Sequence, residues 1–116
     1  MQYALVIYET ADRFADRSDP ARQGAYWSGW MAYSQAIAEA GIMRGGAPLQ
    51  PPDTAATVRT GEARRVQDGP FADTKEQLGG FFLIEVASQE EALAWAARAP
   101  DCTVEVRPVL ARESMG

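Results

Sequence analysis

The residues best suited to chemistry gather in one stretch, QDGPFADTKEQLGGFFLIE, at positions 67–85. It holds Asp68 beside a glycine and a proline, and Lys75, the one lysine among eleven basic residues. A carboxylate can act as a base, and a lysine can lose its proton in a desolvated site where an arginine keeps its charge. Asp68 and Lys75 are therefore the candidate catalytic residues, for proton transfer on a small carbonyl compound or for hydrolysis by an activated water.

A structural role is the alternative for both residues, and we rank it first. Asp68 and Gly69 form a turn dipeptide, so the carboxylate can accept hydrogen bonds from its own turn. The residues from Asp73 to Glu76 have the form of a helix start, whose free N–H groups would attract an anion. In the structural interpretation they are a short turn, and Lys75 pairs with a surface acid for about 0–1 kcal/mol.

Further side chains are candidates for binding a ligand. Arg44 and Gln50 flank a loop rich in glycine and proline. Phe71 is an aromatic anchor able to stack on a ligand, and Thr74 is a potential helix cap. Two others form a charged pair that, in a buried interface, would need each other or a ligand. The candidate ligand-binding residues are Tyr8, Arg44, Gln50, Phe71, Thr74, Glu85 and Arg107.

The composition excludes several kinds of site and partner. The 116 residues include no histidine, which removes the usual general base near neutral pH and the commonest metal ligand. We therefore expect no metal and no cofactor. A net charge of -5 without a long basic cluster argues against nucleic acid as a partner. No apolar run approaches the roughly 20 residues that span a bilayer, so no membrane contact is expected.

Cys102 is the single cysteine, so no disulfide can form within the chain. This fits a reducing cytoplasm, and the N-terminus reads as mature protein rather than as a signal peptide. No basic neighbour marks the Cys102 thiol as a nucleophile.

Hydrophobic patterns predict the elements that position these residues. Residues 3–9 read as a strand with two apolar faces, and a polar link, TADRFADRSDP, follows it. Residues 20–40 read as a helix that ends at Gly41 in the left-handed conformation. The expected core stripe of this helix is Trp27, Trp30, Met31, Ser34, Ile37 and Ala38. A loop over 41–52 follows, and then a hairpin of strands 56–60 and 63–67. A strand over 80–86 leads to a second helix, which begins with the capping box Ser88 to Glu91 and ends before Pro100. The last element is a strand over 103–109.

This order favours an α+β fold on the ferredoxin-like βαββαβ plan with an extra hairpin. It predicts one domain over residues 1–110 and a loose tail over 111–116. Helices can cover only one face of such a sheet, and Phe81 and Leu83 fall on the far face with Glu85. That face is too apolar to leave in water, so we expect a homodimer.

The stretch over residues 68–85 resembles the DGPF family within the YCII-related group. Residues 45–59 (GGAPLQPPDTAATVR), 91–100 (EALAWAARAP) and 104–109 (VEVRPV) resemble it in the same order and spacing. The resemblance thus covers almost the whole chain. It implies a dimeric α+β barrel in which two ferredoxin-like sheets pack face to face around a cavity.

The resemblance implies less about activity, because members of this family lack an established one. A histidine and aspartate pair has been suggested as catalytic in YCII-related proteins, but this chain has no histidine and matches only the aspartate, Asp68. Two interpretations follow. The chain binds a small molecule in the dimer cavity, with carboxylate and lysine acid–base chemistry, or it is a non-catalytic regulatory or interaction module linked to sigma-factor-dependent transcription.

Overall fold

A four-stranded antiparallel sheet carries the fold, and a separate hairpin projects from it. The computed structural model describes residues 1–115. Its elements in chain order are β1 (Gln2–Thr10), α1 (Ala11–Asp16), α2 (Gln23–Glu39), β2 (Met43–Pro48), β3 (Ala56–Arg59), β4 (Arg65–Asp68), β5 (Glu76–Glu85), α3 (Gln89–Ala96) and β6 (Thr103–Pro108), with 3₁₀ turns at Pro52–Thr54 and Arg112–Met115. The strand order in the sheet is β2-β5-β1-β6. The predicted α+β class and the predicted hairpin are confirmed.

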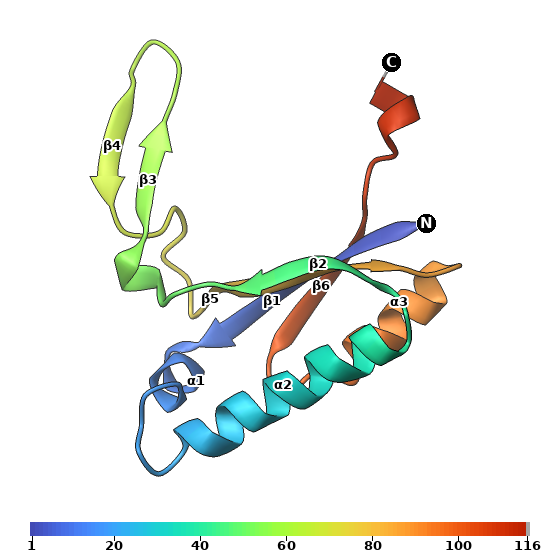
Figure 1. Cartoon of the computed structure of the whole chain (residues 1–116). Helices are drawn as coiled ribbons and strands as arrows, with labels where there is room; N and C mark the ends of the chain where they lie inside the picture. The colour runs from blue at the N-terminus through green and yellow to red at the C-terminus, as the bar shows by residue number, and fades with distance from the viewer. Residues whose placement is uncertain (116) are drawn as a thin grey trace.

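The three α-helices described in residues 1–115 lie on one side of the sheet, while the β3–β4 hairpin rises on the other side (Figure 1). We call this hairpin the arm. The segment after β6 also rises on the arm's side, so the uncovered face of the sheet lies between two projections (Figure 1). The radius of gyration is 16.0 Å, above the roughly 13 Å of a compact domain of about 100 residues. The chain therefore has an open shape.

The core lies between the sheet and the helices. On β1, Tyr3, Leu5 and Ile7 are buried, while the alternate side chains face the other way. Ile84 of β5 and Ile37 of α2 meet them and are fully buried. On β5, Phe81 and Leu83 are not part of this core, as predicted for residues on the far face. On β1 the pattern predicted two apolar faces without deciding which one meets the helices.

The helix over 20–40 is present, but its buried face is not the expected stripe. It begins at Gln23, and its buried residues are Tyr26, Tyr33 and Ile37. Met31 is 70% exposed, and Ala38 is exposed as well. The prediction is confirmed for Ile37, which is fully buried, and for Trp30, which packs against the core. It was wrong for Trp27, Met31 and Ala38, because the neighbouring tyrosines Tyr26 and Tyr33 are the residues buried on that side. Gly41 does end the helix region with a φ of 74°.

The prediction of a loop over 41–52 is wrong for the first half of that segment, which forms the edge strand β2. Met43–Pro48 pairs antiparallel with β5. Its glycines allow this pairing, because a Cβ on Gly46, at a φ of 150°, would lie 2.6 Å from the carbonyl oxygen of Phe81. An edge strand also tolerates Pro48, since one side of it needs no hydrogen bonds.

The polar link expected after β1 contains a helix, α1. Thr10 caps it by accepting a hydrogen bond from the backbone N–H of Arg13 at 3.3 Å, and Phe14 is its buried side chain. One turn and a half of helix is too short for a periodic pattern to reveal.

The helix start expected at Asp73 to Glu76 is wrong, because Glu76 begins strand β5. The hydroxyl of Thr74 donates to the carbonyl of Glu76 at 2.7 Å, and the Gln77 amide donates to the carbonyl of Ala72 at 2.7 Å. These bonds fix a turn that leads into the strand. The capping box is confirmed at α3, where Ser88 Oγ accepts from the N–H of Glu91 at 3.2 Å.

Candidate functional site

A buried carboxylate lies at the end of β1. Glu9 follows Tyr3, Leu5 and Ile7 on the helix-facing side of the strand, and it is 1% exposed. An ionised carboxylate without partners would be very costly in that position. Its partners therefore define the local structure.

Arg17 pairs with Glu9 and joins four parts of the chain. Its Nη2 donates to Glu9 Oε1 at 3.0 Å and to the carbonyl of Gly79 at 3.1 Å. Its Nε donates to the Tyr26 hydroxyl at 2.9 Å, and its Nη1 donates to the carbonyl of Leu49. The guanidinium thus fixes the connection between α1 and α2 against β1, β5 and the segment after β2.

Tyr26 of α2 completes the cluster. Its hydroxyl lies 2.7 Å from Glu9 Oε1 and 2.8 Å from Oε2 and donates to this carboxylate. Burial, together with the hydrogen bond to Glu9, raises the pKa of Tyr26 to about 12. The phenol therefore remains a donor at neutral pH. We call Glu9, Arg17 and Tyr26 the buried charge cluster.

A β-bulge in β5 makes room for this cluster. Ile7 pairs with Gly80 and Tyr8 with Leu78, so Gly79 is the extra residue. A Cβ on Gly79 would lie 2.9 Å from Glu9 Oε1, so any larger residue here would push against the carboxylate. Gly79 and Gly80 thus both serve close packing, since a Cβ on Gly80 would lie 2.9 Å from the carbonyl oxygen of Ala47.

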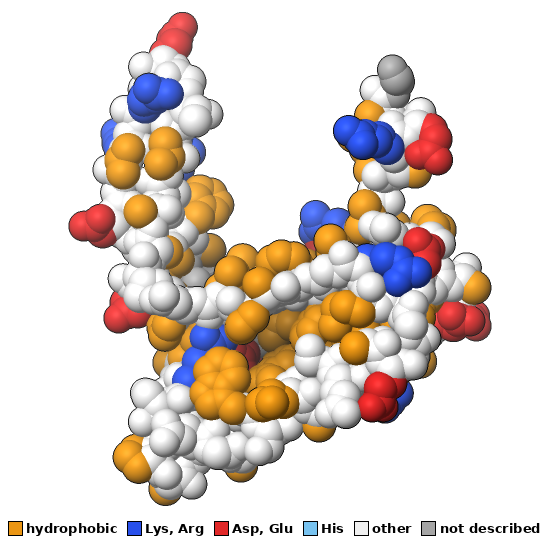
Figure 2. All heavy atoms as spheres, viewed as in Figure 1, with side chains coloured by type: hydrophobic (Ala, Val, Ile, Leu, Met, Phe, Trp, Pro, Cys, Tyr) orange, Lys and Arg blue, Asp and Glu red, His pale blue; other side chains and the backbone are white. Residues whose placement is uncertain are grey.

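A cavity of about 460 Å³ opens between α2 and the β2–β5 edge of the sheet, and the buried charge cluster lies among its lining residues. We call it the α2 cavity. Its lining is mainly apolar, with aromatic rings from Tyr26, Trp27, Trp30 and Phe82. Figure 2 shows the hollow between β2 and α2, with hydrophobic side chains around it and basic and acidic atoms within. This combination is typical of small-molecule sites, whose volumes are about 300–1,000 Å³.

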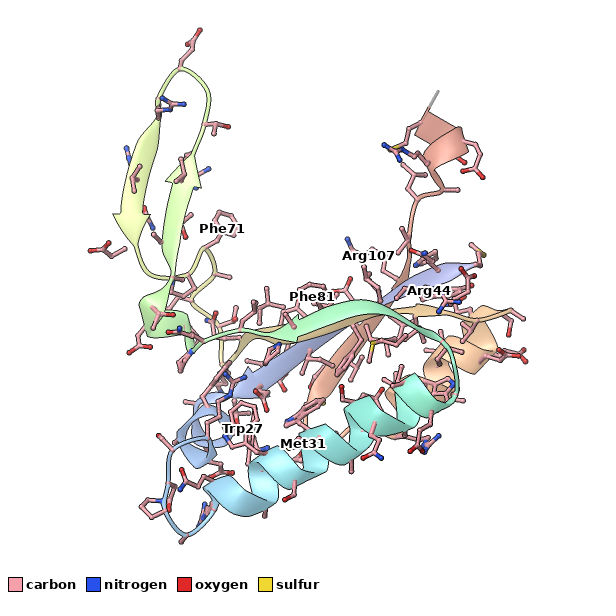
Figure 3. The ribbon with its side chains drawn as sticks, in the orientation of Figure 1. Trp27, Met31, Arg44, Phe71, Phe81 and Arg107 are labelled. Carbon is pink, nitrogen blue, oxygen red and sulfur yellow. The ribbon has the colours of Figure 1, made fainter. Side chains whose placement is uncertain are left out.

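Two large apolar side chains of α2 line this cavity and still contact solvent. Trp27 is 37% exposed and Met31 is 70% exposed. Figure 3 shows both on the side of α2 that faces β2. The Trp27 ring also lies 5.5 Å from the guanidinium carbon of Arg17. Burial of these side chains by a ligand would be favourable.

A second hollow, of about 510 Å³, lies at the foot of the arm. We call it the arm groove. Four of the predicted ligand-binding residues line it, namely Tyr8, Gln50, Phe71 and Thr74. Phe71 is 75% exposed, and Figure 3 shows it beside the arm above the sheet.

The other predicted site residues lie apart from both hollows. Asp68 ends β4 and Lys75 precedes β5; both are exposed, and neither lines the α2 cavity or the arm groove. Arg44 of β2 donates to the carbonyls of Gly41 and Met43.

Glu85 and Arg107, which were predicted to need each other or a ligand in a buried interface, do not pair within the single chain. Glu85 accepts a hydrogen bond from the N-terminal ammonium group, and Arg107 donates to Glu105. Glu85 thus pairs with the start of the neighbouring strand β1, and Arg107 pairs within its own strand β6.

Asp68→Asn and Lys75→Met should each change the free energy of unfolding by less than about 0.5 kcal/mol, because exposed charges outside ion-pair networks contribute little. Urea unfolding of the two variants beside the wild type measures this. A loss of more than about 1 kcal/mol in either variant would show that its side chain holds the turn in place.

Cys102 should react slowly with thiol reagents. Burial raises the pKa of its thiol from 9.0 to about 11. Since the thiolate is the reactive form, its fraction near neutral pH falls about a hundredfold relative to an ordinary cysteine. The rate of alkylation by iodoacetamide at pH 8, compared with that of free cysteine, tests this; equal rates would contradict it.

Glu9 and Arg17 were not among the predicted site residues, although the sequence carries one signal for Glu9. The alternation that buries Tyr3, Leu5 and Ile7 also places Glu9 on the buried face. A buried acid requires a cationic or hydrogen-bonding partner. The identity of that partner was not readable, because Arg17 lies in what the pattern indicated to be a polar link.

Among residues 1–115, no group of three or more histidine, cysteine, aspartate or glutamate side chains is arranged to hold a metal ion. No helix in the same range has the length and apolar character needed to cross a membrane.

Comparison with known proteins identifies a family and a relative. The family model described as the YCII-related domain matches residues 1–112. An uncharacterized protein of Rhizobium meliloti (strain 1021) is 44% identical to the chain over 84 residues, which are 67% of this chain and 68% of that protein. The resemblance that the sequence motifs indicated is therefore confirmed.

Proposed function

The chain belongs to the YCII-related family, and on that premise we propose that it binds a small, mainly apolar molecule in the α2 cavity. The observation that carries the proposal is the joining of an apolar cavity of about 460 Å³ to a buried cluster in which Glu9 and Arg17 form an ion pair. Such a cavity combines a surface that attracts an apolar body with polar groups that orient it.

The position of the cluster supports a binding role. Its charges belong to side chains that are 1% exposed for Glu9 and 10% exposed for Arg17. A buried ion pair is weak evidence for stability, since apolar residues of similar volume often replace it without loss. Its location in the lining of a cavity is explained more directly by recognition of a polar group.

Binding can be tested by the rise in melting temperature on adding small apolar compounds. A ligand present at about 100 times its dissociation constant stabilises the folded state by about 2.7 kcal/mol. We expect Trp27→Ala to weaken binding, because this ring lines the cavity.

Phe71→Ala is the matched control. It removes an exposed aromatic ring that lies in the arm groove and not in the α2 cavity. The proposal fails if no compound stabilises the wild type, or if the two variants weaken binding equally.

We also propose that two copies pair through the uncovered face of the sheet, as a ferredoxin-like unit in a dimeric barrel would. Hydrophobic atoms lie along this face between the arm and the C-terminal segment, and the arm is itself partly hydrophobic (Figure 2). Val58, Val66 and Phe71 of the arm region are 54%, 66% and 75% exposed. A second copy would cover these surfaces and would lie beside the arm groove.

Val6→Asp should convert such a dimer to a monomer, because Val6 is a β1 residue on the uncovered face. Sedimentation should give twice the mass of the chain for the wild type. Ser28→Asp, on the exposed surface of α2, is the control and should remain dimeric. A wild type that stays monomeric at all concentrations would rule out the dimer.

A further inference from the structure

The chemical class of the ligand follows from the hydrogen bonds that the cluster has already made. A guanidinium carries five N–H donors. Four of those of Arg17 are bound within the chain, to Glu9, Gly79, Tyr26 and Leu49. One N–H, on Nη1, has no acceptor among residues 1–115. Since Arg17 lines the cavity, this N–H is a donor for a ligand bound there. The indole N–H of Trp30, another lining residue, also has no partner, but its Nε1 atom is buried and out of reach of a ligand.

The charge of the cluster is already balanced. Glu9 and Arg17 neutralise each other at 3.0 Å, and the Tyr26 hydroxyl donates to the same carboxylate. An anionic ligand would approach Arg17 with the Glu9 carboxylate beside it, and it would lose its hydration in a mainly apolar cavity. A cationic ligand would meet the guanidinium. A neutral group avoids both costs.

The rest of the cavity selects the body of the ligand. Trp27, Trp30 and Phe82 line it, and the Trp30 and Phe82 rings lie nearly parallel at 6.4 Å. Aromatic side chains favour flat rings that stack or meet them edge to face. Met31 adds a flexible, polarisable side chain to the lining.

We infer that the α2 cavity binds a neutral molecule with an aromatic body and one oxygen acceptor, a carbonyl or a hydroxyl, which takes the remaining N–H of Arg17. This inference rests on the proposed binding function of the cavity and specifies its ligand. The apolar rings supply the affinity, and the single hydrogen bond sets the orientation of the bound molecule.

Three related probes test the inference by isothermal titration calorimetry: naphthalene, acetonaphthone and naphthoate. The ketone and the carboxylate have nearly the same shape, so they differ mainly in charge. Acetonaphthone should bind about three- to tenfold more tightly than naphthalene, the gain expected from one hydrogen bond, and more tightly than naphthoate.

The double variant Glu9→Gln/Arg17→Met removes both charges together and should abolish the advantage of the ketone over naphthalene. Phe71→Ala should preserve that advantage. Persistence of the advantage in the double variant would overturn the role of Arg17. The three probes on the wild type decide the ligand class even if the double variant does not fold.

The outcomes separate the two proposals. Tightest binding of naphthoate, or equal binding of naphthalene and acetonaphthone, would overturn the inferred ligand class and leave binding in the α2 cavity intact. Failure of all three probes to bind would count against the binding function itself, and the inference would fall with it.

Discussion

Arg17→Met should lower the free energy of unfolding by about 3–5 kcal/mol, because it leaves the Glu9 carboxylate buried without a counter-charge. Glu9 is 1% exposed and cannot turn toward water without leaving the face that it shares with Ile7. Tyr26 would remain as a donor, but a neutral hydroxyl compensates a buried charge only in part. Urea unfolding followed by circular dichroism measures the loss.

The matched control is Arg22→Met, the same change at an arginine whose side chain is 70% exposed and pairs with Asp16 at 3.5 Å. It should cost less than about 1 kcal/mol. Adding Glu9→Gln to Arg17→Met should restore much of the stability, because the uncompensated charge is then gone. A loss at Arg17 no larger than that at Arg22 would mean that the ion pair does not hold this part of the fold.

Gly79→Ala should lower the free energy of unfolding by about 1–3 kcal/mol through overpacking. The added Cβ would lie 2.9 Å from Glu9 Oε1, 3.3 Å from Arg17 Nη2 and 3.3 Å from the Phe14 ring. All three atoms belong to side chains enclosed by the cluster and by α1, so none can move freely. Chemical unfolding of the variant tests this directly.

Gly24→Ala is the control for Gly79→Ala. Gly24 lies in the first turn of α2, and a Cβ there would meet nothing within 4 Å. This substitution should be neutral or should stabilise the protein by up to about 1 kcal/mol, since alanine favours the helix. Equal effects at the two glycines would show that the bulge has room for a side chain and that the cluster does not require Gly79.

The fold was largely readable from the sequence where a pattern was long. The alternation in β1 and in the second half of β5, the helix over 23–39 and the capping box at Ser88 all involve neighbours along the chain. Shorter or weaker patterns failed. β2 contains adjacent glycines and a proline, and pairing with β5 alone makes it a strand.

The candidate site was less predictable, because its members are distant in sequence. The motif at residues 67–85 predicted Asp68 and Lys75 as candidate catalytic residues, and both side chains are exposed in the structure. The same motif contributes Gly79, whose role depends on Glu9 and Arg17, some 60 to 70 residues earlier. No local pattern links such residues.

The sequence by itself determined the α+β class, the family, the hairpin and the alternation of side chains along β1, because each depends on local periodicity or on a contiguous motif. Only the tertiary structure decided which polar side chains are buried together in the lining of the α2 cavity. An antiparallel sheet places the end of β1 beside the start of β5, and the turn after α1 returns Arg17 to that point. Glu9 and Arg17 then pair because the interior is of low polarity, where an unpaired charge would be very costly.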